Sequence, residues 1–282
     1  MKMNSIKQSI LLIILLLTVF AGQVVGQEEK MDAYVKYEVF HIADTTRKDS
    51  PIKMDMYVYV SPNYAFYSKM KPDSFGPNQM TFSYDNIPSD LVDSYLYNKS
   101  SNAYFKMEFA GNLFRIKSDK KSIAWDIKDE EKEIGGYQCI KAIGEFGGRT
   151  YEVWYTPEIP YAYGPWKLEG LPGLILEAND LKNEIKISYA GFNKMADEFN
   201  FSKLMELEET TAQKISKVKK AMEEDVLTTM MASMPAGAQI TFKGEDGKEM
   251  SKEEAEAMIQ QSKKKQKKER PFELNNPAER IL

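Results

Sequence analysis

The 282-residue sequence contains a single cysteine, Cys139, and a single histidine, His41. One cysteine excludes an intramolecular disulfide, so the fold must be stabilised by packing. One histidine excludes a histidine-rich zinc site, and a Cys–His pair would have no third group to orient it. Cys139 lies among apolar neighbours, which predicts a buried thiol in a strand. We therefore expect neither a metal nor a cofactor.

The sequence also lacks an excess of basic residues. Lys and Arg number 38 against 42 Asp and Glu, which gives a formal charge of −4. Removal of residues 1–26 would take away Lys2 and Lys7 and no acid, so the remaining chain is more acidic still. A net negative charge argues against a nucleic-acid partner.

No apolar run in the sequence is long enough to span a membrane as a helix. The run from residue 10 to residue 21 follows two lysines and precedes several small residues, which is the pattern of a signal peptide. We expect cleavage before Gln27, and no cysteine follows the run that could carry a lipid anchor. The sequence therefore predicts an exported protein, periplasmic or extracellular, that is soluble after cleavage and has no transmembrane anchor.

From residue 32 to about residue 202, apolar and polar residues alternate in short segments separated by turn-forming residues. This alternation predicts half-buried strands, and the lack of helical segments between them favours antiparallel meander connections. We expect a mainly β (α+β) fold with one curved antiparallel meander sheet or partial barrel. The expected strands are residues 33–40, 53–60, 63–69, 94–99, 103–109, 113–117, 122–127, 137–143, 149–155, 174–178 and 184–190.

After Phe201 the pattern becomes helical. Apolar residues recur at helical spacing at Ile215, Val218, Met222, Val226 and Met230. They predict a helix over residues 203–234 that packs on or beside the sheet. Ser251 and Glu254 form a capping-box pattern that begins a second, charged helix. The predicted organisation is a signal peptide (1–26), a β domain (27–202), a helical, charged extension (203–270) and a C-terminal tail (271–282).

The connection over residues 156–173 is rich in proline, glycine and aromatic residues. Pro172 and Gly173 suit the two central positions of a type II turn, where proline fixes φ and glycine accepts a positive φ. A connection of this length is typical of a functional loop or of a loop that covers a core. The candidate contacts for a ligand or partner are Trp154, Tyr155, Tyr163 and Trp166. Alternatively, these aromatic side chains fill the sheet.

The motif GLPGLILE at 170–177 resembles the GLPGLI family of Bacteroidetes. The segments WYTPEIP at 154–160, GPW at 164–166 and GYQCIKA at 136–142 also resemble this family, as does NPAE at 276–279. The lysine-rich region 203–270 is a departure from it. The resemblance implies an exported, mostly β envelope protein and brings no catalytic residue.

No catalytic constellation is visible in the sequence. Acidic residues are abundant, but their spacing does not distinguish a catalytic pair of carboxylates from surface charge. GEFGG at 144–148 lacks the lysine and the following helix of a phosphate loop, and instead predicts a hairpin turn. We expect a non-enzymatic envelope protein that binds an apolar ligand, a peptide or another envelope protein near the loop. A half-barrel carrier of lipids or lipoproteins and a carboxylate-dependent hydrolase are the alternatives.

Overall fold

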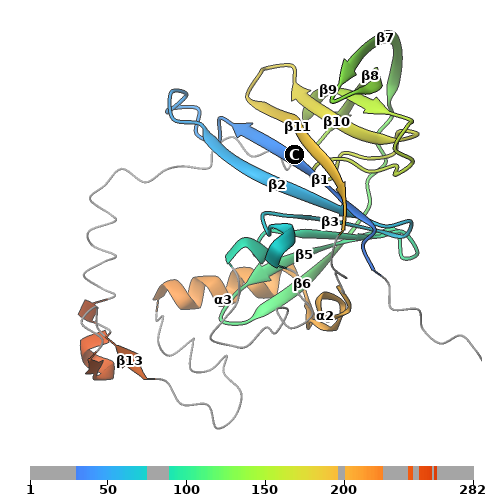
Figure 1. Cartoon of the computed structure of the whole chain (residues 1–282). Coiled ribbons are helices and arrows are strands. Elements are labelled where there is room, and N and C mark those ends of the chain that lie inside the picture. The colour runs from blue at the N-terminus through green and yellow to red at the C-terminus, as the bar shows by residue number, and fades with distance from the viewer. Residues whose placement is uncertain are drawn as a thin grey trace, which may run out of the picture.

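The computed structural model describes residues 30–74, 89–195, 201–224, 241–243, 248–255 and 257–258. These residues form a twelve-stranded sheet, a two-stranded sheet and a few short helices (Figure 1). The large sheet runs from β12 at one edge to β7 at the other and is not closed into a barrel. The expectation of a mainly β fold is confirmed. The predicted signal peptide, the predicted tail and residues 225–240, which include part of the predicted helix, lie outside the described residues.

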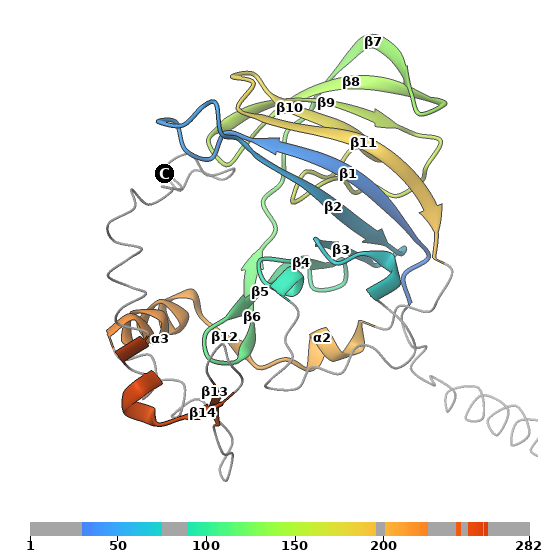
Figure 2. The ribbon, with the colours of Figure 1, turned by 60° about the vertical axis from the view of Figure 1, so that its left-hand side comes forward.

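Two meanders build the large sheet. The first contains β1 (Ala33–His41), β2 (Ile52–Val60), β3 (Tyr64–Ser68), β4 (Tyr95–Asn98), β5 (Ala103–Phe109) and β6 (Leu113–Asp119). The second contains β7 (Asp126–Ile134), β8 (Tyr137–Phe146), β9 (Arg149–Thr156), β10 (Leu174–Asp180) and β11 (Ile185–Lys194). β1 pairs with β11 along its whole length and joins the meanders, and the resulting sheet is strongly curved (Figure 2).

The predicted antiparallel pairing holds throughout β1–β11, but the sheet as a whole is mixed. A short strand, β12 (Glu209–Thr210), adds to β6 in the parallel direction. The predicted hairpin turn at 144–148 connects β8 to β9, where Gly147 and Gly148 have positive φ angles of 56° and 73°. Such angles are readily adopted by glycine.

The expected strand at 122–127 is wrong as far as Trp125, whereas Asp126 and Ile127 begin β7. Residues 120–125 instead carry the chain from β6 to β7 at the opposite edge of the sheet. Trp125 in this segment donates a hydrogen bond from Nε1 to the carbonyl oxygen of Glu169, at 2.9 Å. The rest of β7 was not predicted because its sequence, DIKDEEKEI, is mostly charged and exposed. An edge strand tolerates this composition, since charge on an edge also discourages pairing with other chains.

Apolar residues are buried on both faces of the sheet, and β2 shows why. Successive side chains of a strand point to opposite faces. Met56, Val58 and Val60 belong to one buried cluster, which includes residues of the loop after β9. Tyr57 and Tyr59 belong to a second cluster, which includes Leu204 of α2 (Ser202–Glu206). The first cluster therefore lies beneath the loop over residues 157–173, which we call the proline-rich loop.

The longest described helix is α3 (Ala212–Glu224). It begins after Thr211, whose Oγ1 accepts a hydrogen bond from the backbone nitrogen of Lys214 at 3.3 Å, as an N-cap does. Ile215 is buried and Val218 is half-buried, whereas the side chain of Met222 lies outside the described residues. In both views α3 lies near β5 and β6 (Figures 1 and 2).

The remaining described elements are short. They are η1 (Pro72–Ser74), η2 (Ser89–Leu91), β13 (Phe242–Lys243) and β14 (Glu249–Met250), of which the last two pair with each other. Ser251 and Glu254 exchange backbone-to-side-chain hydrogen bonds of 2.7 and 3.2 Å, which is the predicted capping box. Within the described part of the chain, every helix is too short or too polar to cross a membrane.

Candidate functional site

The four aromatic residues that were expected to contact one ligand all belong to the first buried cluster or pack against it. Trp154 and Tyr155 are neighbours in β9, so their side chains lie on opposite faces of the sheet. Tyr155 and Tyr163 are only 3% and 6% exposed. Trp166 is half-buried, and its ring packs edge-on against Phe146 with a centroid separation of 5.3 Å. These four side chains are therefore largely packed into the fold.

Trp154 is covered by lysine side chains. The Nζ of Lys132 lies 4.4 Å from the ring centroid, and that of Lys141 lies 5.8 Å away. Lys132 also pairs with Glu177 of β10 at 2.5 Å. These cation–π contacts and this ion pair connect β7, β8 and β10 across the ring, which is 8% exposed.

Tyr163 fixes the loop after β9 to the sheet. Its hydroxyl donates to the carbonyl oxygen of Pro62 at 3.3 Å, and its own carbonyl oxygen accepts a hydrogen bond from Ile175 N at 2.9 Å. Its ring also meets Tyr97 edge-on at 6.0 Å. The loop is therefore an anchored cover over the first buried cluster.

The loop reaches β10 through Gly173, which has a φ of 150°. The backbone nitrogen of Gly173 donates to the carbonyl oxygen of Leu171 at 2.8 Å. This bond spans two residues, whereas that of a type II turn spans three. A Cβ atom on Gly173 would lie 2.0 Å from the carbonyl oxygen of Thr156. Glycine is therefore required here by close backbone approach as well as by φ. Pro172, which precedes it, is exposed.

A buried carboxyl group, that of Glu169, lies at the end of the loop. Its Oε1 is 3.0 Å from the Nζ of Lys120, and the side chain is 5% exposed. Burial raises the pKa of Glu169, while its contacts with Tyr104 and Lys120 lower it in part. The neighbouring cavity has a volume of only about 10 Å³, which is room for one water at most. We assign Glu169 to holding the 120–125 segment against the loop, since no substrate fits beside it.

A larger opening lies between β4–β6 and α3, and we call it the sheet–helix groove. Its volume is about 770 Å³, within the range of small-molecule sites. Its aromatic and polar lining residues are Tyr95, Lys106, Glu108, Ser118, Lys167, Ser216, Lys219 and Lys220. Lys167 comes from the proline-rich loop, so the loop forms part of the groove wall.

Glu108 of β5 is the buried acid of the sheet–helix groove. Its carboxylate lies 2.5 Å from the Nζ of Lys106 and also contacts the Nζ of Lys219 on α3. Lys106 pairs in addition with Asp93 at 2.8 Å. Burial alone would lower the pKa of Lys106, but hydrogen bonds to Asp93 and Glu108 raise it overall, so this lysine stays charged. The groove therefore holds a fixed set of charges.

Lys167 connects the groove to the aromatic residues around it. Its Nζ lies 4.8 Å from the ring centroid of Tyr95, 5.9 Å from that of Tyr104 and 5.8 Å from that of Trp166. Trp166 has a φ of 59°, an unusual conformation for a bulky residue. This backbone conformation lies immediately before Lys167, at the point where the loop borders the groove.

A second groove, of about 650 Å³, lies across β1, β2 and β11. Its lining includes Phe40 together with residues of both charges, among them Glu38, Lys53 and Lys186. In neither groove, nor elsewhere among the described residues, do three His, Cys, Asp or Glu side chains gather as metal ligands would.

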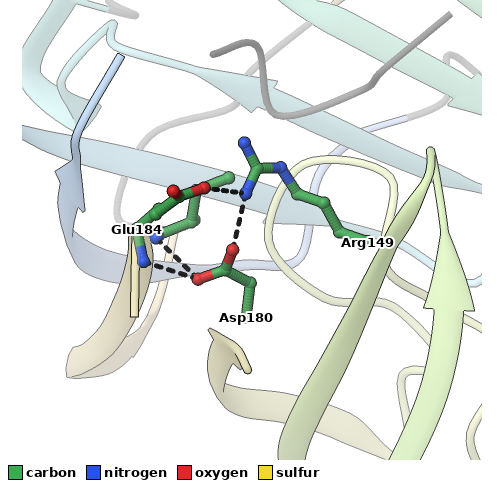
Figure 3. Close-up of polar contacts among 4 residues, drawn as sticks. Arg149, Asp180 and Glu184 are labelled. Carbon is green, nitrogen blue, oxygen red and sulfur yellow. Dashed lines mark hydrogen bonds and ion pairs between the residues drawn. The ribbon is translucent and has the colours of Figure 1, made fainter. Parts of the chain in front are cut away.

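A buried charged cluster lies where β9 begins and β10 ends (Figure 3). Arg149 donates from Nη1 to Asp180 at 2.5 Å and to Glu184 at 2.9 Å. The other carboxylate oxygen of Asp180 accepts hydrogen bonds from the backbone nitrogens of Glu184 and Ile185, at 2.7 and 2.9 Å. Because both oxygens of Asp180 are engaged within the fold, we assign this cluster to fixing the turn between β10 and β11.

The family described as "N-glycanase peptide, N-terminal domain" matches residues 82–243, more than half of the sequence. Two solved structures of PNGF-II, in the C2 and P21 space groups, are similar to the chain, each with 15% identity and a TM-score of 0.49. They cover 76% and 79% of this chain, which spans 36% and 38% of their length. No curated protein matches the chain.

This family match over residues 82–243 corrects the resemblance to the GLPGLI family, which rested on short segments between residues 136 and 177 and at 276–279. That short motif specifies a tight turn at Gly173 and a buried strand after it, which are features of local structure. The match also overturns the expectation of a non-enzymatic binding protein and its lipid-carrier alternative, because N-glycanases are enzymes.

Proposed function

The chain belongs to the N-glycanase peptide, N-terminal domain family, and on this premise we propose that it acts on N-linked glycans of glycoproteins. The observation that carries the proposal is the coincidence of the family match with the sheet–helix groove. Every residue that lines this groove falls within 82–243. Most residues of the second groove fall within 38–55, outside the match. We therefore place the glycan in the sheet–helix groove.

The chemistry of the groove suits an oligosaccharide. Sugar hydroxyls need both donors and acceptors of hydrogen bonds, and the groove offers the ammonium group of Lys106 beside the carboxylate of Glu108. Tyr95 adds an apolar ring with a polar hydroxyl, the combination by which tyrosine contacts amphipathic ligands. These groups come from neighbouring strands of the large sheet, and the ion pair between Lys106 and Glu108 holds two of them in place.

The acids of the groove do not form the pair that a glycosidase uses to hydrolyse a glycosidic bond. Glycosidases that retain or invert configuration use two carboxyl groups on either side of the bond, about 5 to 9.5 Å apart. Among the described residues that line the groove, Glu108 supplies the only carboxylate. The groove thus contributes recognition of the sugar to the removal of N-linked glycans.

We also propose that the chain is exported. Residues 1–26 have the charged start, apolar run and small residues of a signal peptide. An exported chain meets glycoproteins outside the cytoplasm, which agrees with an action on N-linked glycans.

The experiment compares a fluorescent N-glycopeptide with the same peptide lacking its glycan. Fluorescence anisotropy measures binding of each peptide to the full chain, and mass spectrometry after prolonged incubation measures loss of the glycan. We expect the chain to bind the glycopeptide selectively and to release its glycan. Equal affinity for the two peptides, or neither binding nor release, would contradict the proposal.

A further inference from the structure

The charge of the sheet–helix groove is opposite to that of the whole chain. Lys106, Lys167, Lys219 and Lys220 line the groove, and Glu108 is the one acid among its described lining residues. The whole chain has a formal charge of −4. A cleft lined mainly by one sign of charge concentrates ligands of the opposite sign. The groove is therefore a local positive site on a negative protein.

The ion pairs found among the described residues leave an excess of lysine in the groove. Lys106 pairs with Asp93 and Glu108, and Lys219 also contacts Glu108. Even without Lys167, the three ammonium groups of Lys106, Lys219 and Lys220 outnumber the carboxylates of Asp93 and Glu108. Lys219 and Lys220 are exposed on α3, so a ligand in the groove can reach their side chains.

Resting on the proposed function, which makes this groove the glycan site, we propose that the sheet–helix groove prefers N-glycans that carry an acidic group. The acidic group is a carboxylate or a sulfate ester on a sugar, because lysine binds either anion as a compact point charge. Lys219 and Lys220 pair with this group while the neutral part of the glycan lies against Tyr95.

The test uses three fluorescent glycopeptides with the same peptide and the same core glycan. One glycan is neutral, one is capped with sialic acid and one carries a sulfate ester, and anisotropy gives the Kd of each for the full chain. We expect at least one anionic form to bind about 2- to 10-fold more tightly than the neutral form. Added salt should reduce this difference. Tighter binding of only one anion identifies the source of the acidic group, whereas equal affinity for all three overturns the inference.

Variants of α3 show whether the preference arises in the groove. In the double variant Lys219→Gln/Lys220→Gln, the ratio of neutral to anionic Kd should fall towards one. Lys217→Gln is the matched control, since Lys217 is exposed on the same helix but does not line the groove. Glutamine and lysine have similar helix propensities, so α3 should persist in all variants. An equal fall in the ratio for the control would overturn the inference.

The two proposals fail in different ways. If the wild-type chain binds neither the neutral nor the anionic glycopeptides, the proposed function itself fails. If it binds the neutral and anionic forms equally, the glycan site stands and the preference for acidic glycans is overturned.

Discussion

Arg149 and Asp180 form an ion pair in which both side chains are 2% exposed and Nη1 lies 2.5 Å from Oδ2. The pair connects the start of β9 to the end of β10, and Asp180 also holds the backbone of the turn into β11. β11 is the strand that pairs with β1 and so joins the two meanders. A buried ion pair therefore lies close to the junction on which the whole sheet depends.

Asp180→Ala should lower the free energy of unfolding by about 3–5 kcal/mol, because it takes a charged partner from the buried guanidinium of Arg149. Urea unfolding of the variant and wild type measures the loss. The control is Glu130→Ala, which removes a 62% exposed partner of Lys141 and should cost at most about 1 kcal/mol. Similar losses in the two variants would contradict a structural role for the buried pair.

Gly173→Ala should destabilise the fold by about 2–5 kcal/mol, since the new Cβ would lie 2.0 Å from the carbonyl oxygen of Thr156. Gly136→Ala separates this contact from backbone strain. Gly136 also has a positive φ, of 87°, but a methyl group at this position would meet no atom within 4 Å, so we expect a loss of about 1 kcal/mol. Equal midpoints in urea for the two variants would show that the close contact has no effect.

Cys139 should resist alkylation in the folded chain. It is buried in β8, and burial raises the pKa of its thiol to about 11. At pH 8 only about one thiol in a thousand would then be the reactive thiolate. Mass spectrometry after iodoacetamide treatment should show slow labelling in buffer and rapid labelling in denaturant. Labelling at the same rate in both conditions would contradict the buried position.

Glu169 should make stability depend on pH. Its pKa in the folded protein is raised above the ordinary value of 4.5, so the folded state keeps the proton to higher pH than the unfolded state. The stabilising contribution is present below pH about 4.5 and is lost as the pH rises through the folded pKa.

The measurement for Glu169 is urea unfolding of wild type and Glu169→Gln across this pH window. The free energy of unfolding of wild type relative to the variant should fall as the pH rises, because glutamine does not titrate. A difference between the two proteins that is constant with pH would rule out this titration.

Local patterns in the sequence predicted most of the sheet. Alternation located β1, where every second residue is buried, and β2 and β9, which begin with alternation before both of their faces become buried. It missed all but the first two residues of β7, whose charged side chains carry no such signal. It also placed a strand at Trp125, where an indole hydrogen bond to the loop replaces strand pairing.

The sheet–helix groove was harder to predict, although one signal for it exists. In β5, Lys106 and Glu108 alternate with the buried residues Phe105 and Met107, which marks a polar face. That this face meets α3 and Lys167 depends on long-range topology, which local patterns do not contain. The prediction of Trp166 as a contact residue therefore located the loop, but it missed Lys167, the neighbouring residue that lines the groove.

The affinity of an N-glycopeptide for the Tyr95→Ala chain tests the central claim most directly. Tyr95 lines the sheet–helix groove, whereas Phe40, also a half-buried aromatic residue, lines the second groove. By anisotropy, Tyr95→Ala should raise the Kd at least about 5-fold through loss of the aromatic contact, and Phe40→Ala should leave it unchanged. Weaker binding by Phe40→Ala with full affinity in Tyr95→Ala would contradict the placement of the glycan in the sheet–helix groove.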